Sequence, residues 1–265
     1  MPQYICKTCA VQQAKSATPP ATCPICEDPR QFVPEGGQAW MTPDALSGYG
    51  NAFRMVAPDT MTIRTVPQLG IGQRAFLLRT PAGNVLWDCI TLLDEATIQI
   101  VRALGGLAAV AISHPHFYSA MARWGRTFDC PVFIHARDRE WVQEPDPCIA
   151  FWDGETRDIL SGLTLHRFGG HFPGSAVLHW RERRTLFTGD TVLVTTDRQH
   201  VAFQWSYPND VPLPAATVRE MAARFEALDF ASLHSPFTER GSIEEDAKEA
   251  VARSAARHLE PPCYD

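Results

Sequence analysis

Hydrophobic and polar positions along this chain follow two different periods, and the switches between them predict a series of strands and helices. In the first half, alternating or continuous apolar runs predict strands at Met61–Val66, Arg74–Arg79, Asn84–Asp88, Leu107–Ile112 and Pro131–His135. Thr80-Pro81-Ala82-Gly83 separates the second and third of these as a hairpin turn. Helices are expected over Asp94–Leu104, where Asp94 is the expected N-cap, and over Phe117–Trp124.

The second half repeats this order of strands followed by helices. Strands are predicted at Gly162–Phe168, Ser175–Trp180, Arg184–Thr188 and Ala231–Leu233. Helices are predicted over Ala215–Leu228 and Ser242–Leu259, the latter opening with the capping box Ser242-x-x-Glu245. Two rounds of strands and helices predict the α/β (α+β) class: two packed sheets with helices outside, a four-layer αββα sandwich.

The chain before residue 61 has a different character. Residues 1–30 contain few core-forming side chains, so we expect metal binding to supply the free energy that folds them. Residues 31–60 are interrupted repeatedly by proline and glycine, which predicts a linker or wrapping segment with little regular structure. The expected organisation is a small module at 1–30, a linker at 31–60 and a main domain at 61–265.

Four of the eight cysteines form two closely spaced pairs, Cys6-x2-Cys9 and Cys23-x2-Cys26. Such pairs favour a tetrahedral metal site, with zinc as the expected metal and iron as the competitor. The Cys23-Pro-Ile-Cys26 knuckle resembles those of zinc ribbons and rubredoxins. An iron version would be an electron-transfer module, and a structural zinc clip packed on the main domain is the simpler interpretation. The remaining cysteines are expected to be free thiols: Cys89, Cys130, Cys148 and Cys263.

Composition narrows the class of protein. The 265 residues are 45% apolar and 20% charged, which is typical of a globular domain, and the net charge is −6. A protein that binds the phosphate backbone should show a basic stripe, so we expect no nucleic-acid partner. We also expect no signal peptide and no membrane span, because no apolar run approaches roughly 18 residues. Paired cysteines in such a chain indicate a reducing compartment, the cytoplasm.

Three histidines and one carboxylate stand where predicted strands end. His114 and His116 follow the buried strand two positions apart, so both side chains point to the same side of the backbone. His171 lies in a Gly-Gly-His-Phe-Pro-Gly loop, and Asp190 ends a Thr-Gly-Asp sequence. Three imidazoles and a carboxylate suit zinc, with manganese or iron as alternatives.

These motifs, in this order, resemble the metallo-β-lactamase superfamily, and its glyoxalase-II-like hydrolase branch is the most similar. The resemblance covers about residues 60–260 and includes His234 in a late strand-end loop. It implies that His114, His116 and His171 hold a first metal ion. It also implies that Asp190 would bridge to a second ion, which His234 would help to bind.

The chain departs from the family's His-x-His-x-Asp-His motif at its last two positions, which are Tyr118 and Ser119. A second metal site would therefore lack two of its ligands, and we predict one metal ion, held by His114, His116, His171 and Asp190. His234 would then be a weak ligand, a general acid or base, or a substrate contact. Tyr118 or His234 could replace the second metal ion by hydrogen bonding.

The predicted function is a metal-dependent hydrolase that acts on a small-molecule ester, thioester, lactone or phosphoester. A metal ion held by imidazoles can lower the pKa of bound water from 15.7 toward about 7. One alternative is a non-catalytic binding protein in which Tyr118 and Ser119 mark a degenerate site. A second is an iron-dependent oxygenase or redox relative. A third is a nucleic-acid processor, which the acidic charge balance disfavours.

Overall fold

The larger of two main sheets forms one side of the molecule in the computed structural model, which describes residues 1–260. Its seven strands lie side by side in chain order: β3 (Gly50–Ala57), β4 (Thr60–Val66), β5 (Ala75–Thr80), β6 (Gly83–Trp87), β7 (Ala109–Ala111), β8 (Val132–His135) and β9 (Ile149–Trp152). The first four strands pair antiparallel, and β6 to β9 pair in parallel.

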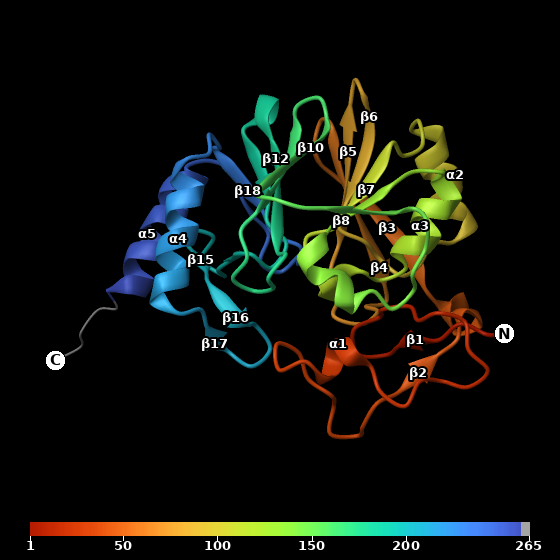
Figure 1. Ribbon diagram of the computed structural model, residues 1–265. Coiled ribbons are helices and arrows are strands. Elements are labelled where there is room, and N and C mark those ends of the chain that lie inside the picture. The colour runs from red at the N-terminus through yellow and green to blue at the C-terminus, as the bar shows by residue number, and fades with distance from the viewer. Residues whose placement is uncertain (261–265) are drawn as a thin grey trace.

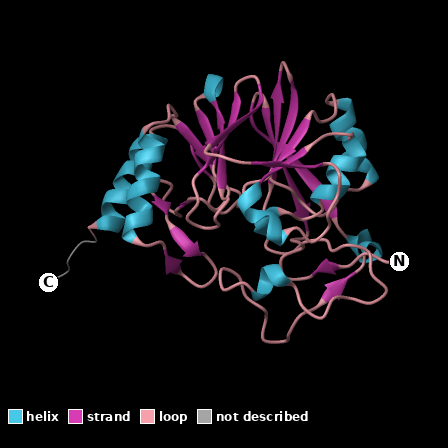
Figure 2. Ribbon diagram, viewed as in Figure 1, coloured by secondary structure: helices cyan, strands magenta, loops and turns pink. Residues whose placement is uncertain are grey.

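The second sheet has six strands and packs against the first (Figure 1). Its order is β10 (Thr156–Leu160), β11 (Leu163–Arg167), β12 (Ala176–Trp180), β13 (Thr185–Phe187), β18 (Ser232–His234) and β19 (Ser242–Ile243). Figure 2 shows helices outside both sheets, with α2 (Glu95–Ala103) and α3 (Met121–Phe128) beside the larger sheet. α4 (Ala215–Glu226) and α5 (Ala247–Leu259) cover the smaller one. The predicted four-layer αββα sandwich is confirmed.

Strand alternation distributes the apolar side chains among three interfaces. In β5 and β6, Leu77 and Leu86 point outward and pack with Trp124 of α3. Their neighbours Phe76 and Trp87 point inward and pack with Phe187 of the opposite sheet. A third core joins α4 and α5 to the outer face of the smaller sheet. The central strands β5, β6, β7, β12 and β13 are buried on both faces, so their sequences are nearly continuous apolar runs.

Short elements complete the fold. Small two-stranded sheets pair β1 (Ile5–Cys6) with β2 (Trp40–Met41), β14 (Leu193–Val194) with β15 (Val201–Ala202), and β16 (Gln204–Ser206) with β17 (Val211–Pro212). The remaining helical segments are α1 (Pro24–Glu27), η1 (Pro43–Gly48), η2 (Pro115–Phe117), η3 (Ala136–Trp141) and η4 (Arg181–Arg183). The two last small sheets belong to the long connection between Asp190 and α4.

Several local predictions match the structure. The Asp94 carboxylate accepts a hydrogen bond from the Thr97 backbone N–H at 2.8 Å, as an N-cap should. The β5–β6 hairpin closes with Thr80 opposite Gly83. Among the predicted free thiols, Cys89, Cys130 and Cys148 are free, and Cys263 lies outside the described residues.

Three local predictions are wrong. The predicted capping box at Ser242 does not form, because Ser242–Ile243 pairs with β18 as strand β19 and α5 begins only at Ala247. The helix expected over Phe117–Trp124 starts at Met121, since η2 and a left-handed Ser119 precede it. Residues 50–57 were expected to be irregular but form β3, because pairing with β4 supplies the partners that local sequence does not indicate.

The cysteine-containing segment lies beneath the larger sheet and contacts the main domain along its length (Figure 1). The Gln12 backbone N–H donates to the Ser119 carbonyl at 2.9 Å, and the Thr91 hydroxyl donates to the Ala10 carbonyl at 2.5 Å. The Gln12 side chain also donates to Glu144 at 2.8 Å. Within residues 1–260, no helix combines the length and the hydrophobicity needed to cross a bilayer.

Candidate metal centre

Four side chains from three separate parts of the chain meet at one end of the sandwich: His114, His116, His171 and Asp190. All four are at most 4% exposed, and their ligand atoms lie within 4.8 Å of one another. His171 Nε2 is 3.2 Å from His116 Nδ1, and the Asp190 Oδ2 atom lies 3.5 Å from His114 Nε2 and 3.8 Å from His171 Nε2. Ligands held tetrahedrally at 2.0–2.1 Å from a metal ion lie about 3.4 Å apart. The cluster therefore has the spacing of a metal site.

A chain of hydrogen bonds fixes the orientation of His114. The Asp88 carboxylate, which follows β6, accepts both the backbone N–H of Ser113 at 2.8 Å and its hydroxyl at 2.7 Å. The Ser113 oxygen lies 2.9 Å from His114 Nδ1 and can accept its proton. This arrangement leaves the lone pair of His114 on Nε2, the atom that faces Asp190.

The loop that carries His171 is held in a similar way. His171 Nδ1 lies 2.9 Å from the backbone carbonyl of Trp205 in β16, so Nδ1 donates and Nε2 keeps its lone pair. The preceding Gly170 has φ +78°, and a side chain there would press on Met221 and Leu213 of the helical layer. Only glycine allows this backbone to pass so close to α4.

Asp190 reaches the same place through a second glycine. Gly189 has φ +50°, and a Cβ atom there would overlap the Ser113 side chain. The turn after β13 can therefore pack directly on the turn after β7, although the two strands belong to different sheets. The Thr-Gly-Asp sequence thus places a carboxylate beside His114.

Burial decides the charge state of the cluster. It lowers the pKa of His114 and His116 well below the usual value and that of His171 to about 3. The imidazoles are therefore neutral at neutral pH and able to bind a metal ion. Burial also raises the pKa of Asp190 to about 6, against the opposing influence of His171. Among the converging atoms, His114 Nε2 faces Asp190 and has no hydrogen-bond partner among the described residues, and His171 Nε2 has only His116 Nδ1 opposite it. A cation between these atoms would compensate their burial, so the residues fit a metal ion.

Tyr118 and Ser119, the two positions at which the chain departs from the expected motif, have other contacts. The Tyr118 hydroxyl donates to the Asp138 carbonyl at 3.1 Å, and its ring belongs to the outer core of the larger sheet. The Ser119 hydroxyl donates to the Cys89 carbonyl at 3.1 Å and accepts from Gln73 at 2.9 Å. Both side chains act as packing and hydrogen-bonding elements in the folded chain.

His234 lies outside the four-residue cluster. Its Nδ1 atom is 2.6 Å from the Ser242 hydroxyl, and its ring stacks on Phe187 with centroids 5.0 Å apart. Burial lowers its pKa to about 4, so the ring is neutral at neutral pH. Its predicted role as ligand or acid–base group stays a prediction.

Two features of this centre were not predicted from the sequence. Asp88, predicted only as the end of a strand, is fully buried and orients His114 through Ser113. An aspartate at the end of the strand that precedes the His-x-His strand was the available signal. Arg30, four residues after Cys26, has no local sequence pattern that marks it as part of the site. Its guanidinium carbon lies 4.0 Å from the centroid of Phe172, the residue after His171.

The second ligand cluster consists of the four cysteines predicted to bind metal, and all four are buried. Sγ atoms lie 3.6 Å apart between Cys6 and Cys26 and 3.7 Å apart between Cys9 and Cys23. These distances exclude disulfides and match the spacing of about 3.8 Å that Zn–S bonds of 2.3 Å produce in a tetrahedron. The Gln38 amide and the Cys9 backbone N–H donate to Cys6 Sγ at 3.2 and 3.5 Å, as expected around a thiolate.

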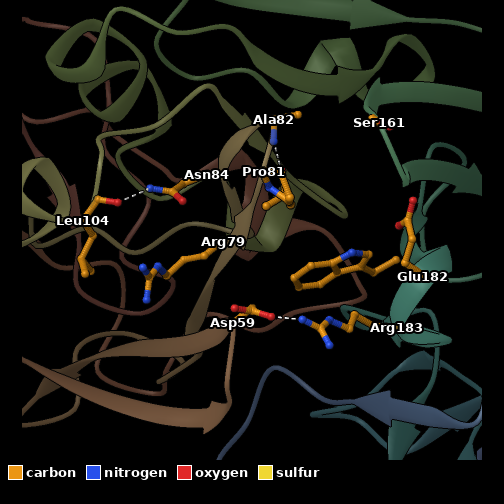
Figure 3. A pocket seen from close by; sticks show the side chains of 11 residues that line it. Asp59, Arg79, Pro81, Ala82, Asn84, Leu104, Ser161, Glu182 and Arg183 are labelled. Atoms are coloured by element: carbon orange, nitrogen blue, oxygen red, sulfur yellow. Dashed lines mark hydrogen bonds and ion pairs between the residues drawn. The ribbon is translucent and has the colours of Figure 1, made fainter.

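A cavity of about 630 Å³ lies at the opposite end of the sandwich. Trp180 is among the residues that line it, and Figure 3 shows the Asp59–Arg183 ion pair at its side and Arg79 pointing into it. It is bordered by the β3–β4 and β5–β6 turns, whereas the metal ligands follow the other ends of the strands. None of the four clustered ligands lines this cavity.

Comparison with known proteins agrees with this geometry. Residues 70–228 match the model of the metallo-beta-lactamase superfamily. The chain is 44% identical to the Bacillus subtilis (strain 168) protein named "Uncharacterized protein YmaE", over 98% of this chain and 96% of that protein. It is 26% identical to "Probable metallo-hydrolase YybB" of the same organism, over 40% of this chain and 55% of that protein.

Solved structures share the fold at low sequence identity. The mono-zinc form of the metallo-beta-lactamase FIM-1 from Pseudomonas aeruginosa has a TM-score of 0.58 and 13% identity, covering 80% of this chain and 97% of that one. The metallo-beta-lactamase from Erythrobacter litoralis has a TM-score of 0.54 and 19% identity, covering 78% and 91%.

The Asp88–Ser113–His114 chain of hydrogen bonds generates a prediction about metal affinity. Ser113→Ala removes the group that orients His114, so the affinity of the histidine site should fall by about 10- to 100-fold. Competition with a chromophoric chelator measures this. Ser232→Ala is the matched control, because that hydroxyl bonds Thr185 in the strands and does not touch the cluster. Equal affinities for the two variants would contradict the proposed role of Ser113.

The cysteine cluster generates a second prediction. Cys23→Ser should lose the metal ion of the module and lower the melting temperature, because metal binding contributes to the folding of this segment. Elemental analysis and thermal denaturation measure the two effects. Cys148→Ser is the control, since Cys148 is a partly exposed free thiol outside the cluster. A Cys23→Ser protein with undiminished metal content would show that the four thiols do not act as ligands.

Proposed function

Because this chain belongs to the metallo-beta-lactamase superfamily, we propose that it is a hydrolase that works with a single zinc ion at His114, His116, His171 and Asp190. The proposed substrate is a small molecule with an ester, thioester, lactone or phosphoester bond. Manganese or iron are the competing metals. The cysteine module is proposed to hold a second, structural zinc ion.

The observation that carries this proposal is the spacing and burial of the four ligands. Three neutral imidazoles and a carboxylate converge within 4.8 Å of one another, with hydrogen bonds behind two of them. Such a donor set suits zinc, and structural restraint of the ligands is what catalytic metal sites require. A degenerate site would have no need for the Asp88–Ser113 support.

Tyr118 and Ser119 are the basis for proposing one metal ion at this site. Both side chains already have hydrogen-bond partners, the Asp138 carbonyl for Tyr118 and the Cys89 carbonyl for Ser119. Neither is a carboxylate or an imidazole, so a second ion would have Asp190 and His234 as its only protein ligands. His234 lies outside the cluster. Two ligands at most are too few for a stable second site.

The chemistry proposed is the attack of water on a carbonyl or phosphoryl centre. A metal ion held by His114, His116, His171 and Asp190 would lower the pKa of water and polarise the substrate oxygen. The protein's own contribution is to hold the imidazoles neutral through burial and to fix His114 and His171 through their Nδ1 hydrogen bonds. Asp190 supplies the negative charge that balances the cation.

His234 is proposed as an acid–base group. It is neutral at neutral pH, and the Ser242 hydroxyl at Nδ1 sets the orientation of the ring. Its stacking partner Phe187 precedes Asp190 by three residues, which places the imidazole near the turn that carries the ligand. A neutral imidazole can pass a proton to a leaving group or take one from water.

Metal content and hydrolysis together test the main proposal. The wild type should hold two metal equivalents per chain, one in each cluster, and His114→Ala should hold one. Hydrolysis of the best substrate in a panel of esters, thioesters, lactones and phosphoesters should fall at least about 10³-fold in His114→Ala. His200→Ala, which removes a partly exposed histidine paired with Asp197, should change neither.

The possible failures of this test differ from one another. If the wild type binds metal only at the cysteines, a non-catalytic binding protein is the better interpretation. Three equivalents would contradict the single-ion site. Iron in the histidine site together with oxygen consumption would favour the redox alternative.

The role of His234 is tested separately. His234→Ala should lower kcat by about 10²-fold, because a positioned acid or base is lost, while both metal equivalents are retained. His166→Ala is the control, because His166 is a half-buried strand histidine of β11. An unchanged kcat, or the loss of a metal equivalent, would contradict an acid–base role.

A further inference from the structure

Arg30 is the point at which the cysteine module approaches the metal centre. It follows Cys26 by four residues, so the position of its backbone depends on the knuckle that the cysteines form. The Asp28 side chain accepts from the Arg30 backbone N–H at 2.9 Å and pairs with its Nε at 3.1 Å. The side chain is only 15% exposed, which is unusual for an arginine.

The main domain clamps this turn of the module from the other side. The Ser206 hydroxyl of β16 donates to the Arg30 carbonyl at 3.0 Å. The Asn209 amide donates to the carbonyls of Pro29 and Gln31 at 3.1 and 3.0 Å. The residue before Ser206 is Trp205, whose carbonyl accepts from the metal ligand His171. One short strand thus positions both a metal ligand and the backbone of Arg30.

The guanidinium lies in an aromatic setting beside the histidines. Its central carbon is 4.0 Å from the centroid of Phe172 and 5.5 Å from that of Trp205. The Phe172 ring in turn contacts His116 and His171, with centroids 4.9 and 5.1 Å apart. A single aromatic ring therefore separates the guanidinium from the imidazoles. The Arg30 charge contributes to lowering the pKa of all three histidines, which is consistent with this proximity.

The hydrogen-bonding capacity of this guanidinium is only partly used. Nε lies 3.1 Å from Asp28 Oδ1 as an ion pair, but both Nε and Nη1 are buried without a hydrogen bond of good geometry among the described residues. Burying a charged donor without a hydrogen bond is costly, and the nearby Asp138 carboxylate already accepts from the Gly174 backbone N–H at 2.7 Å. A chain with net charge −6 has thus placed a cation with spare hydrogen-bonding capacity near its metal centre.

We propose that Arg30 binds an anionic group of the substrate, a carboxylate or a phosphate, so that the cysteine module forms one wall of the substrate site. The planar guanidinium matches the two oxygens of such a group, and its stacking on Phe172 restrains it in advance. This inference rests on the proposed hydrolase function and specifies its substrate class. A substrate would carry its negative charge on one side of the scissile bond, toward Phe172 and Trp205.

Binding of inorganic phosphate to the metal-loaded protein, measured by isothermal titration calorimetry, tests the anion site without any reaction. Arg30→Gln should weaken phosphate binding at least about tenfold, since charge-assisted hydrogen bonds are lost. Arg30→Lys should bind phosphate more tightly than Arg30→Gln but less tightly than the wild type, because it keeps the positive charge but loses the two parallel N–H donors of the guanidinium. Arg79→Gln is the matched control, as it removes the same charge at the opposite end of the sandwich and should bind phosphate like the wild type.

Kinetics test the same residue toward a substrate. For the anionic ester mono-4-nitrophenyl succinate, Arg30→Gln should raise KM about tenfold with a smaller change in kcat. For the neutral ester 4-nitrophenyl acetate, KM should change less than about twofold. Metal content and melting temperature of Arg30→Gln should equal those of the wild type, which separates lost recognition from a damaged module.

The outcomes distinguish this inference from the proposed function. Unchanged phosphate affinity in Arg30→Gln, an equal loss in Arg79→Gln, or no phosphate binding by the wild type would overturn the anion site. If neither ester is hydrolysed by the wild type but phosphate affinity depends on Arg30, the anion site stands and the hydrolase proposal loses its support. An equal rise in KM for both esters would show that Arg30 shapes the site without recognising charge.

Discussion

The burial of four potential metal ligands against one another is the constraint on which the rest of this structure depends. His114, His116, His171 and Asp190 are removed from water at the point where turns from both sheets meet. Their ligand atoms lie at the spacing of metal ligands, and burial keeps the three imidazoles neutral, so the cluster fits a cation. The contact between Gly189 and Ser113 therefore both packs the two sheets together and brings Asp190 beside His114.

The cysteine module contains a second buried cluster of potential metal ligands outside the sandwich. Its four buried sulfurs form a second cluster of the same kind, and its backbone is bonded to Ser119 and to the turn after β16. Ser119 is one of the two positions at which the chain departs from the expected His-x-His-x-Asp-His motif, and its carbonyl accepts from the Gln12 backbone N–H of the module. This departure from the motif and the attachment of the module thus occur at the same place in the structure. Because the module is attached here, the guanidinium of Arg30 lies at the edge of the histidine cluster, against Phe172.

Long-range pairing explains where sequence reasoning failed. Ser242-x-x-Glu245 has the pattern of a helix start, yet β18 recruits Ser242 and Ile243 as an edge strand, and Ser242 bonds His234. Gly50–Ala57 lies in a segment rich in glycine and proline, and it becomes an eight-residue strand because β4 offers a complete ladder of partners. In both cases pairing with a neighbouring strand outweighed the structure that the local sequence favours.

The sequence by itself determined the four layers, the two ligand clusters and the replacement at Tyr118 and Ser119. Periodicity records which faces are buried, and ligand residues at strand ends or in paired knuckles are visible as motifs. Only the tertiary structure decided that Asp88 supports His114 through Ser113, that His234 stands apart from the cluster, and that Arg30 lies beside Phe172. Some of these contacts join residues 25 to more than 140 positions apart, and others depend on the path of a loop. A local pattern of residues contains no information about either.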